Sequence, residues 1–177
     1  IMFNRFDLLD YATPENEVEA ISTLIPASHM LADAIAKKVP ILQISDIDND
    51  GSTAQAMAME IKRITGHDVF VEGRDYDPTN HGFGMNQISN WIEGNGIDPD
   101  SDFMVLVSDL GTNQRDTQAE FLLKYQNANL IIIDHHKPDI DVYVSPDLER
   151  SKLVSPFVKG SIALSMKGGG GVSAGYL

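Results

Sequence analysis

The sequence predicts an α/β protein built on a parallel sheet with crossover helices. Three observations lead to this fold class. Short apolar segments alternate with segments whose apolar residues recur at helical spacing, in the order strand, helix, strand, helix, strand, helix, strand. The strand segments are nearly all apolar, as in strands that are buried on both faces. Each strand segment also stops at polar residues that are able to carry a function.

Local signals place the individual elements. The Thr-Pro pair at residues 13–14 is a typical helix start, and Ser28 starts a second helix. Gly66 provides a left-handed C-cap for a third helix, while Asn86 and Asp116 are the expected N-caps of the two helices that follow. Helices are therefore expected over residues 28–38, 53–65, 86–94 and 116–126, and strands over residues 41–45, 68–72, 102–108 and 129–133.

The amino-acid composition limits the metals and substrates that the protein is expected to bind. At 177 residues the chain is long enough for one domain, or for one domain and an appendage. The absence of cysteine limits metal ligands to Asp, Glu and His, which favours Mg²⁺ or Mn²⁺. The formal net charge of −13 argues against a broad basic surface for duplex DNA, but not against a nucleic-acid substrate held at metal ions. No apolar run is long enough to cross a membrane, and we expect a cytoplasmic location.

Three aspartates within five residues follow the first predicted strand: Asp46, Asp48 and Asp50, closed by Gly51. Their carboxylates repel one another unless a cation lies among them, although an acidic surface turn has a similar composition. A calcium loop of the EF-hand type needs a glutamate at its twelfth position, which here is Met57, and a helix in front of it. The stretch therefore favours another kind of metal site.

Polar residues also follow the other predicted strands: Arg74 the second, Asp109 the third, and Asp134, His135 and His136 the fourth. Because the carboxyl ends of parallel strands meet at one edge, we expect these residues to face one crevice. Up to five carboxylates and two imidazoles in this crevice would attract divalent ions, most economically a pair. For the histidine pair alone, a solvated turn is the alternative. Arg74 is either a bidentate phosphate clamp or one half of a salt bridge.

These motifs resemble those of the DHH phosphoesterase superfamily. The Asp-His-His at residues 134–136 resembles the signature that gives the superfamily its name, residues 46–51 resemble its first motif, and residues 109–111 its second. The loop at 74–86 is similar to the segment between these motifs in RecJ-type single-strand exonucleases. The resemblance extends over about residues 31–146 and is specific because three motifs occur in the right order.

The resemblance implies a metal-dependent phosphodiesterase with two ions, most often Mn²⁺, that cleaves single-stranded DNA from the 5′ end. Single-stranded DNA or short oligonucleotides would be its binding partners. The implied metal ligands are Asp46, Asp48, Asp50, Asp109 and His135. The implied catalytic residues are His136, Asp134 and Arg74. The implied substrate-binding residues are Arg74, His81, Gly168, Gly169, Gly170 and Gly171.

The resemblance also implies separate roles within the metal site. Asp48 would bind one ion, Asp50 the other, and Asp109 both. His135 would complete the second ion's ligands, and Asp46 would bind the first ion at a position where many members carry histidine. His136 would face the scissile phosphate, with Asp134 fixing an imidazole tautomer.

The chain departs from the family pattern in its second half. The fourth motif, a downstream aspartate, has no match, since Asp139, Asp141 and Asp147 lack its surroundings. Residues 157–177 resemble fragments of the glycine-rich substrate-binding domain that usually follows, although a flexible linker has a similar composition. We expect a DHH-type catalytic domain at residues 1–150 and a partial substrate-binding segment at 151–177. Either the protein is a shortened version of the family or segments of that domain are absent from this chain, and we favour absent segments.

Two other function classes are compatible with the sequence. The first is a small-substrate enzyme of the same superfamily: a nanoRNase, a cyclic-dinucleotide phosphodiesterase or a pyrophosphatase. The acidic composition and the lack of basic or aromatic-rich stretches favour short substrates. The second is a degenerate binding module without catalysis, against which the intact Asp-His-His argues.

Overall fold

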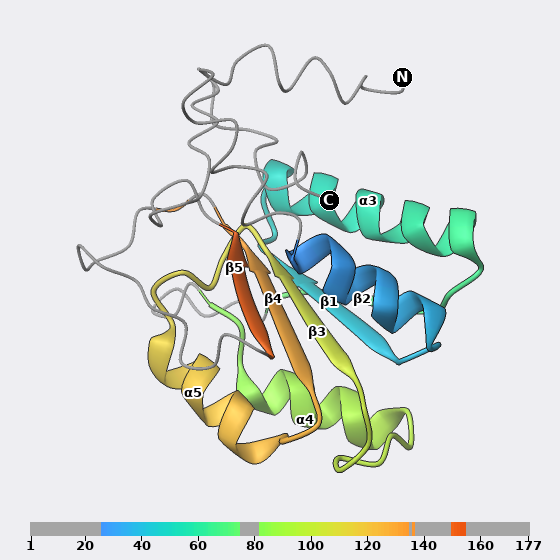
Figure 1. Ribbon diagram of the computed structural model, residues 1–177. Coiled ribbons are helices and arrows are strands. Elements are labelled where there is room, and N and C mark those ends of the chain that lie inside the picture. Colours follow the sequence, from blue (N-terminus) through green and yellow to red (C-terminus); the bar gives the residue numbers. More distant parts are fainter. Residues whose placement is uncertain (1–25, 75–81, 135, 137–149, 155–177) are drawn as a thin grey trace.

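The computed structural model describes residues 26–74, 82–134, 136 and 150–154. A five-stranded, wholly parallel sheet forms the centre of this part of the chain (Figure 1). The strands lie in the order β2-β1-β3-β4-β5. Their bounds are β1 Ile41–Ser45, β2 Val69–Gly73, β3 Met104–Ser108, β4 Asn129–Ile133 and β5 Ser151–Val154. The predicted fold class is confirmed.

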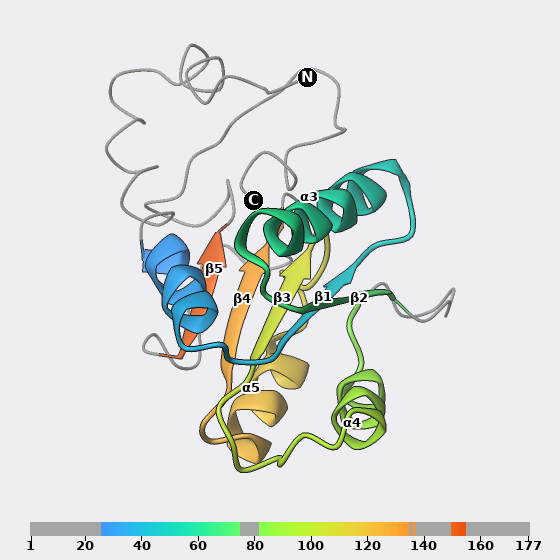
Figure 2. The same cartoon turned by 90° about the vertical axis from the view of Figure 1, so that its right-hand side faces the viewer.

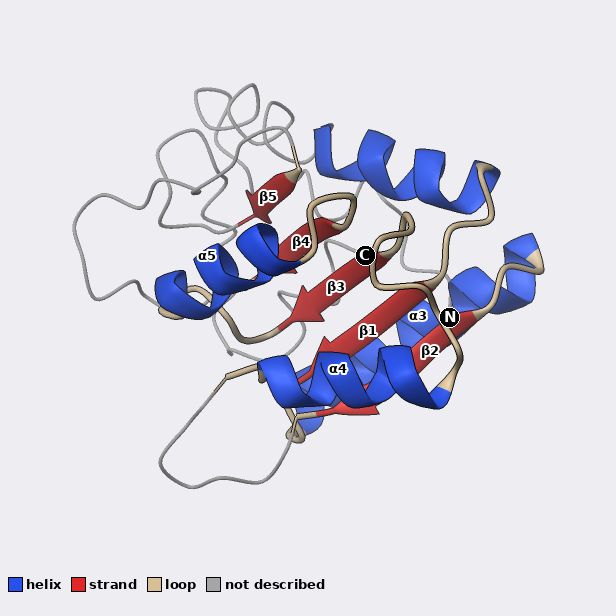
Figure 3. Ribbon diagram, turned by 90° about the horizontal axis from the view of Figure 1, so that it is seen from below, coloured by secondary structure: helices blue, strands red, loops and turns tan. Residues whose placement is uncertain are grey.

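Helices cover both faces of the sheet. A helix over residues 26–36 and α3 (Asn49–Thr65) lie on one face (Figure 2). The other face carries α4 (Met85–Gly94) and α5 (Arg115–Lys124), which lie in front of the sheet in Figure 3. Within the described ranges, no helix is both long and apolar enough to cross a membrane.

The helices begin earlier than predicted. The first described helix is already formed at residue 26, so Ser28 lies inside it. The N-cap of α3 is Asp48, whose carboxylate accepts hydrogen bonds from the first-turn amides, so the aspartate motif itself enters the helix. Gly84 and Gln114, instead of Asn86 and Asp116, precede α4 and α5. The predicted C-cap is confirmed, since Gly66 has a φ of 69°.

The strand ends are level with one another. Ser45 at the end of β1 pairs with Gly73 of β2 and with Ser108 of β3. Ser108 in turn pairs with Ile133 of β4, and Ile133 pairs with Val154 of β5. The residues that follow the strands therefore start at one edge, here called the carboxyl edge. Strand order reverses between β1 and β3, where open α/β sheets usually bind their ligands.

Buried aromatic rings fill the space between the sheet and α4 and α5. The ring of Phe103 lies edge-on to Trp91, Phe121 and Tyr125, with centroids 5.8, 6.1 and 5.2 Å away. Such pairs contribute about 0.5–1.5 kcal/mol each beyond the area that they bury. This packing fixes the two helices whose N-terminal loops reach the carboxyl edge.

The fifth strand is a feature that the sequence did not predict. It begins next to Arg150, whose guanidinium donates hydrogen bonds of 2.9–3.0 Å to the carbonyls of Leu122, Tyr125 and Gln126. These carbonyls belong to the end of α5 and the turn after it, where a cation is favoured by the helix dipole. Arg150 therefore fixes the start of β5 to α5.

Candidate metal centre

The turn between β1 and α3 brings two of the three clustered aspartates to the start of a helix. Asp48 accepts hydrogen bonds at Oδ1 from the amides of Asp50 (3.1 Å) and Gly51 (3.0 Å). The bond from Gly51 is the main reason that the pKa of Asp48 lies below its ordinary value. Asp50 is buried in the first turn. A Cβ atom on Gly51 would come within 2.1 Å of the carbonyl oxygen of Asp46, so this turn requires glycine.

Asp109 follows β3 at the reversal of strand order. Its backbone has a φ of 63°, which is uncommon for a residue with a side chain and costs on the order of 1 kcal/mol. Only 1% of the residue is exposed. Burial, followed by the nearby charges of Asp50 and Asp48, raises the pKa of Asp109 to about 8. The carboxyl group of Asp109 thus lies near those of Asp48 and Asp50, close enough for their charges to act on its pKa.

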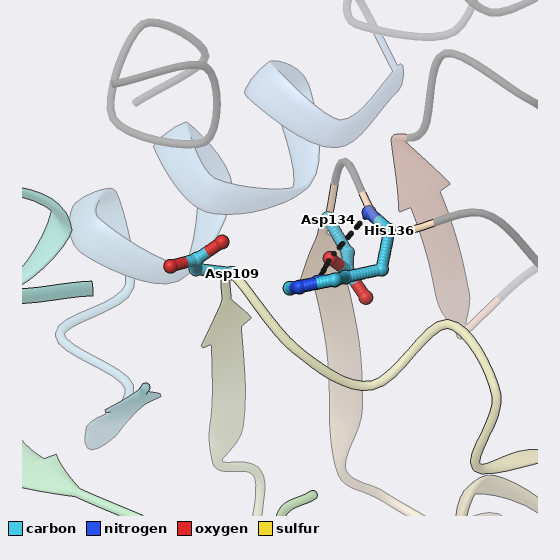
Figure 4. A group of neighbouring side chains, drawn as sticks. All are labelled: Asp109, Asp134 and His136. Atoms are coloured by element: carbon cyan, nitrogen blue, oxygen red, sulfur yellow. Dashed lines mark hydrogen bonds and ion pairs between the residues drawn. The ribbon is translucent and has the colours of Figure 1, made fainter. Parts of the chain in front are cut away.

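Asp134 and His136 follow β4 and form a hydrogen-bonded pair (Figure 4). Nδ1 of His136 lies 2.7 Å from Oδ1 of Asp134, and Oδ2 of Asp134 accepts a 2.8 Å hydrogen bond from the amide of Thr112. Burial raises the pKa of Asp134, but the hydrogen bonds from His136 and Thr112 outweigh it and hold that pKa below its ordinary value. The hydrogen bond that His136 donates to Asp134 raises the pKa of His136 to about 9.

The imidazole ring of His136 extends from Asp134 toward Asp109 (Figure 4). Because Nδ1 faces Asp134, Nε2 is the ring atom left for other contacts. Ligand atoms of Asp109, Asp134 and His136 lie within 4.8 Å of one another. Both oxygens of Asp134 already accept hydrogen bonds, so its geometry suits holding the imidazole better than binding an ion.

Arg74 and Asp46 are paired with each other. Nε of Arg74 donates a 2.6 Å hydrogen bond to Oδ1 of Asp46, and the side chains are 7% and 15% exposed. The amide of Ile47 donates to the same oxygen at 2.6 Å. Arg74 therefore forms a largely buried salt bridge with Asp46, and its role as a phosphate clamp stays a prediction.

The donor set fits a divalent cation. Carboxylate oxygens and an imidazole are the ligands that Mg²⁺ and Mn²⁺ accept. Burial, and then the charges of Asp50 and Asp48, raise the pKa of Asp109, and a cation beside it would stabilise the ionised carboxylate. Asp109 and His136 belong to the group whose ligand atoms converge, and the carboxylates of Asp48 and Asp50 lie near Asp109.

Some predicted residues cannot be compared with the structure. His81, His135 and the glycines 168–171 lie outside the described residues, as does the helix predicted at residue 13. Two other residues at the carboxyl edge were missed by sequence reasoning. The amide of Thr112 holds Asp134, and the side chain of Gln114 holds the backbone of Phe83. No local sequence pattern indicates either contact, because the partners are 22 and 31 residues apart in the chain.

The parallel sheet with helices on both faces has a fold similar to that of a DHH domain. No protein family and no curated protein matches the sequence. Among solved structures, the chain is similar to the exonuclease RecJ bound to manganese, at 22% identity and a TM-score of 0.56 over 76% of this chain and 31% of the other. It is also similar to RecJ from Thermus thermophilus in complex with Mn²⁺, at 22% identity and 0.60 over 86% and 19%.

A third similar structure is the DHH domain of a protein assigned to a family of ribosomal proteins. It has 18% identity and a TM-score of 0.61 over 82% of this chain and 36% of the other. The chain thus spans at most 36% of the length of these proteins. The shared feature is the fold, and the chemistry has to be argued from the residues.

Proposed function

We propose that this chain is a metal-dependent phosphodiesterase that hydrolyses single-stranded nucleic acid, most specifically a RecJ-like 5′ to 3′ exonuclease acting on single-stranded DNA. The observation that carries the proposal is Asp109, a buried carboxyl at the strand reversal, crowded by Asp48 and Asp50. The catalytic-domain boundary at residue 150 and the cytoplasmic location remain predictions.

The proposed roles divide between ion binding and phosphate binding. Asp48, Asp50 and Asp109 would hold two Mn²⁺ or Mg²⁺ ions, with Asp109 shared between them. Bound ions of this kind lower the pKa of a water ligand and neutralise charge on the phosphate. The hydrogen bond to Asp134 raises the pKa of His136 to about 9, and this favours the imidazolium form, which would bind a phosphate oxygen. Asp134 also fixes the orientation of the ring.

Arg74 and Asp46 have more limited roles in this proposal. Because its Nε is bound to Asp46, Arg74 would contact a phosphate as one member of an ion pair and not as an unpaired cation. Asp46 would have to bind an ion through Oδ2, because Oδ1 accepts hydrogen bonds from Arg74 and from the amide of Ile47. His135 as a ligand, and His81 and the glycines 168–171 as substrate contacts, remain proposals by resemblance.

A second candidate is a phosphodiesterase for dinucleotides or other short substrates. Two observations favour it: the net charge of −13, and the pairing of Arg74 at the carboxyl edge with a carboxylate. A long strand would need cationic contacts beyond the ions.

Digestion of a labelled oligonucleotide tests the proposal. A single-stranded oligonucleotide, 5′-labelled in one reaction and 3′-labelled in another, is incubated with Mn²⁺ or with EDTA beside a dinucleotide. Early release of a 5′-labelled mononucleotide, with a descending ladder from the 3′-labelled strand, supports the exonuclease. Cleavage of the dinucleotide alone supports the second candidate, and cleavage of neither refutes both.

Asp109→Asn is the variant expected to be inactive. Asp102→Asn makes the same substitution away from the site and is its matched control. Asp102 is an exposed carboxylate just before β3, at the opposite end of the strand that Asp109 follows. Asp102→Asn should leave cleavage unchanged, whereas Asp109→Asn should abolish it. Equal loss in both variants would contradict the assignment of the site.

A further inference from the structure

The side chain of Gln114 is bound to the backbone of a distant loop. Its Oε1 accepts a 2.7 Å hydrogen bond from the amide of Phe83, and its Nε2 donates a 3.1 Å hydrogen bond to the carbonyl of the same residue. The carboxamide of Gln114 thus pairs with both the amide and the carbonyl of Phe83, in the way that a residue on a neighbouring β-strand would. Phe83 itself is fully buried, so the loop at residues 82–84 is held by packing and by these two bonds.

Gly82 is adapted to this contact. A Cβ atom placed on Gly82 would lie 1.9 Å from Cδ and Nε2 of Gln114, and the three nearest atoms all belong to the Gln114 side chain. The φ of Gly82 is not positive, so its backbone does not itself require glycine. The space for Gln114 is therefore the physical reason for glycine at this position.

The connection from Asp109 to Gln114 contacts three other parts of the carboxyl edge. The side chain of Asp109 lies near Asp48 at the start of α3, and the amide of Thr112 donates a hydrogen bond to Asp134 after β4. Gln114, at the other end of the connection, holds Phe83 before α4. The connection is short and itself tied, since the amide of Gln114 donates a 3.0 Å bond to the carbonyl of Gly111. A shift in the position of Asp109 can therefore be transmitted to the loop at 82–84 through the backbone of residues 109–114.

We propose that Gln114 is a positioning residue that couples the loop at 82–84 to the metal centre, so that the loop takes its substrate-binding position when Asp109 is bound to a cation. The part of this inference that concerns substrate rests on the proposed function; the coupling itself does not. Gln114 acts through the loop and makes no contact with the ion. Its loss should impair the binding of extended substrates more than the chemistry at the phosphate.

Amide hydrogen exchange measures the coupling without any activity. In the wild-type protein, Mg²⁺ should slow exchange of the Phe83 amide relative to EDTA. In Gln114→Ala, this amide should exchange about tenfold faster, as expected for the loss of one hydrogen bond, and its rate should no longer respond to Mg²⁺. Gln126→Ala, the same change at an exposed position after α5, is the matched control. A Mg²⁺ response that persists in Gln114→Ala overturns the proposal.

A double-mutant cycle tests the contact independently. Gly82→Ala should displace the Gln114 side chain and reproduce the faster exchange of the Phe83 amide. Once Gln114 is alanine, the new methyl group has room, so Gly82→Ala should add little in that background. Additive effects of the two substitutions would show that they act separately and would refute the shared contact.

Kinetics connect the coupling to substrate. Gln114→Ala should raise KM for an oligonucleotide about tenfold with kcat nearly unchanged, and should leave hydrolysis of bis(p-nitrophenyl) phosphate intact. A fall in kcat on both substrates overturns the positioning role. If the wild-type protein hydrolyses neither substrate, the proposed function fails, while the exchange experiments still decide the coupling.

Discussion

Replacing Asp109 by asparagine should stabilise the metal-free protein. The folded state holds the pKa of this carboxyl at about 8, chiefly through burial and then through Asp50 and Asp48, against an ordinary value of 3.8. At pH 7 the unfolded chain is ionised there and the folded chain is not. About three pH units separate 3.8 from 7, at about 1.4 kcal/mol each, so the carboxyl costs at most about 4 kcal/mol. Buried sites relax around charge, and we expect a gain of about 2 kcal/mol.

The pH dependence of the stability gain in Asp109→Asn tests whether the raised pKa of Asp109 is its cause. A carboxyl whose pKa is raised by folding contributes stability that is fully present below 3.8 and is lost as the pH rises to about 8. The advantage of Asp109→Asn should therefore be small near pH 4 and grow until about pH 8. Urea unfolding in EDTA, followed by fluorescence of Trp91, the single tryptophan, measures it between pH 4.5 and 8.5. A gain that does not change with pH, or a loss at pH 8, would refute the reasoning.

Bound Mg²⁺ should make the wild-type protein more stable than Asp109→Asn. Mg²⁺ at saturation should stabilise the wild-type protein, since the ion binds only the folded state, and should leave Asp109→Asn nearly unchanged. Ion binding should also release about one proton at pH 7, because Asp109 must ionise; calorimetry in two buffers of different ionisation enthalpy counts it. Asp102→Asn should behave as wild type in both measurements.

Three further changes test other parts of the site. His136→Ala should lower kcat at least about hundredfold with metal affinity nearly unchanged; loss of metal binding instead would make His136 a ligand. Arg74→Gln should cost about 3 kcal/mol in urea unfolding because it leaves the Asp46 carboxylate without its buried counter-charge, and adding Asp46→Asn should recover most of this loss. Gly51→Ala should cost about 2 kcal/mol and weaken Mg²⁺ binding, since the new Cβ would meet the carbonyl of Asp46; unaltered binding would separate that turn from the metal centre.

The sequence predicted the sheet because its signals are local. The apolar runs that end at Ser45, Ser108 and Ile133 could be recognised within a few residues, and the strand at Asn129–Ile133 was placed at its observed bounds. The convergence of Asp48, Asp50 and Asp109 also followed, because parallel topology alone brings those strand ends together. Their roles toward a metal remain predictions.

What the sequence did not reveal depends on contacts between distant residues. Ser151–Val154 has no apolar run, and its strand identity comes from pairing with β4. The Arg74 partner lies 28 residues away and the Gln114 partner 31, so neither contact leaves a periodic signal. The early start of α3 was missed for a different reason, since Asp48 was interpreted as a metal ligand and not also as a helix cap.

The direction of β5 determines where the next part of the chain starts. Because β5 is parallel to β4 and Val154 is level with Ile133, the chain leaves the sheet at the carboxyl edge. Arg150 anchors the other end of this strand to α5, so the exit point is held at a fixed distance from Asp134. The last described residue of β5 therefore lies at the same edge of the sheet as Asp109 and Asp134, so the connection that follows starts beside the candidate metal centre.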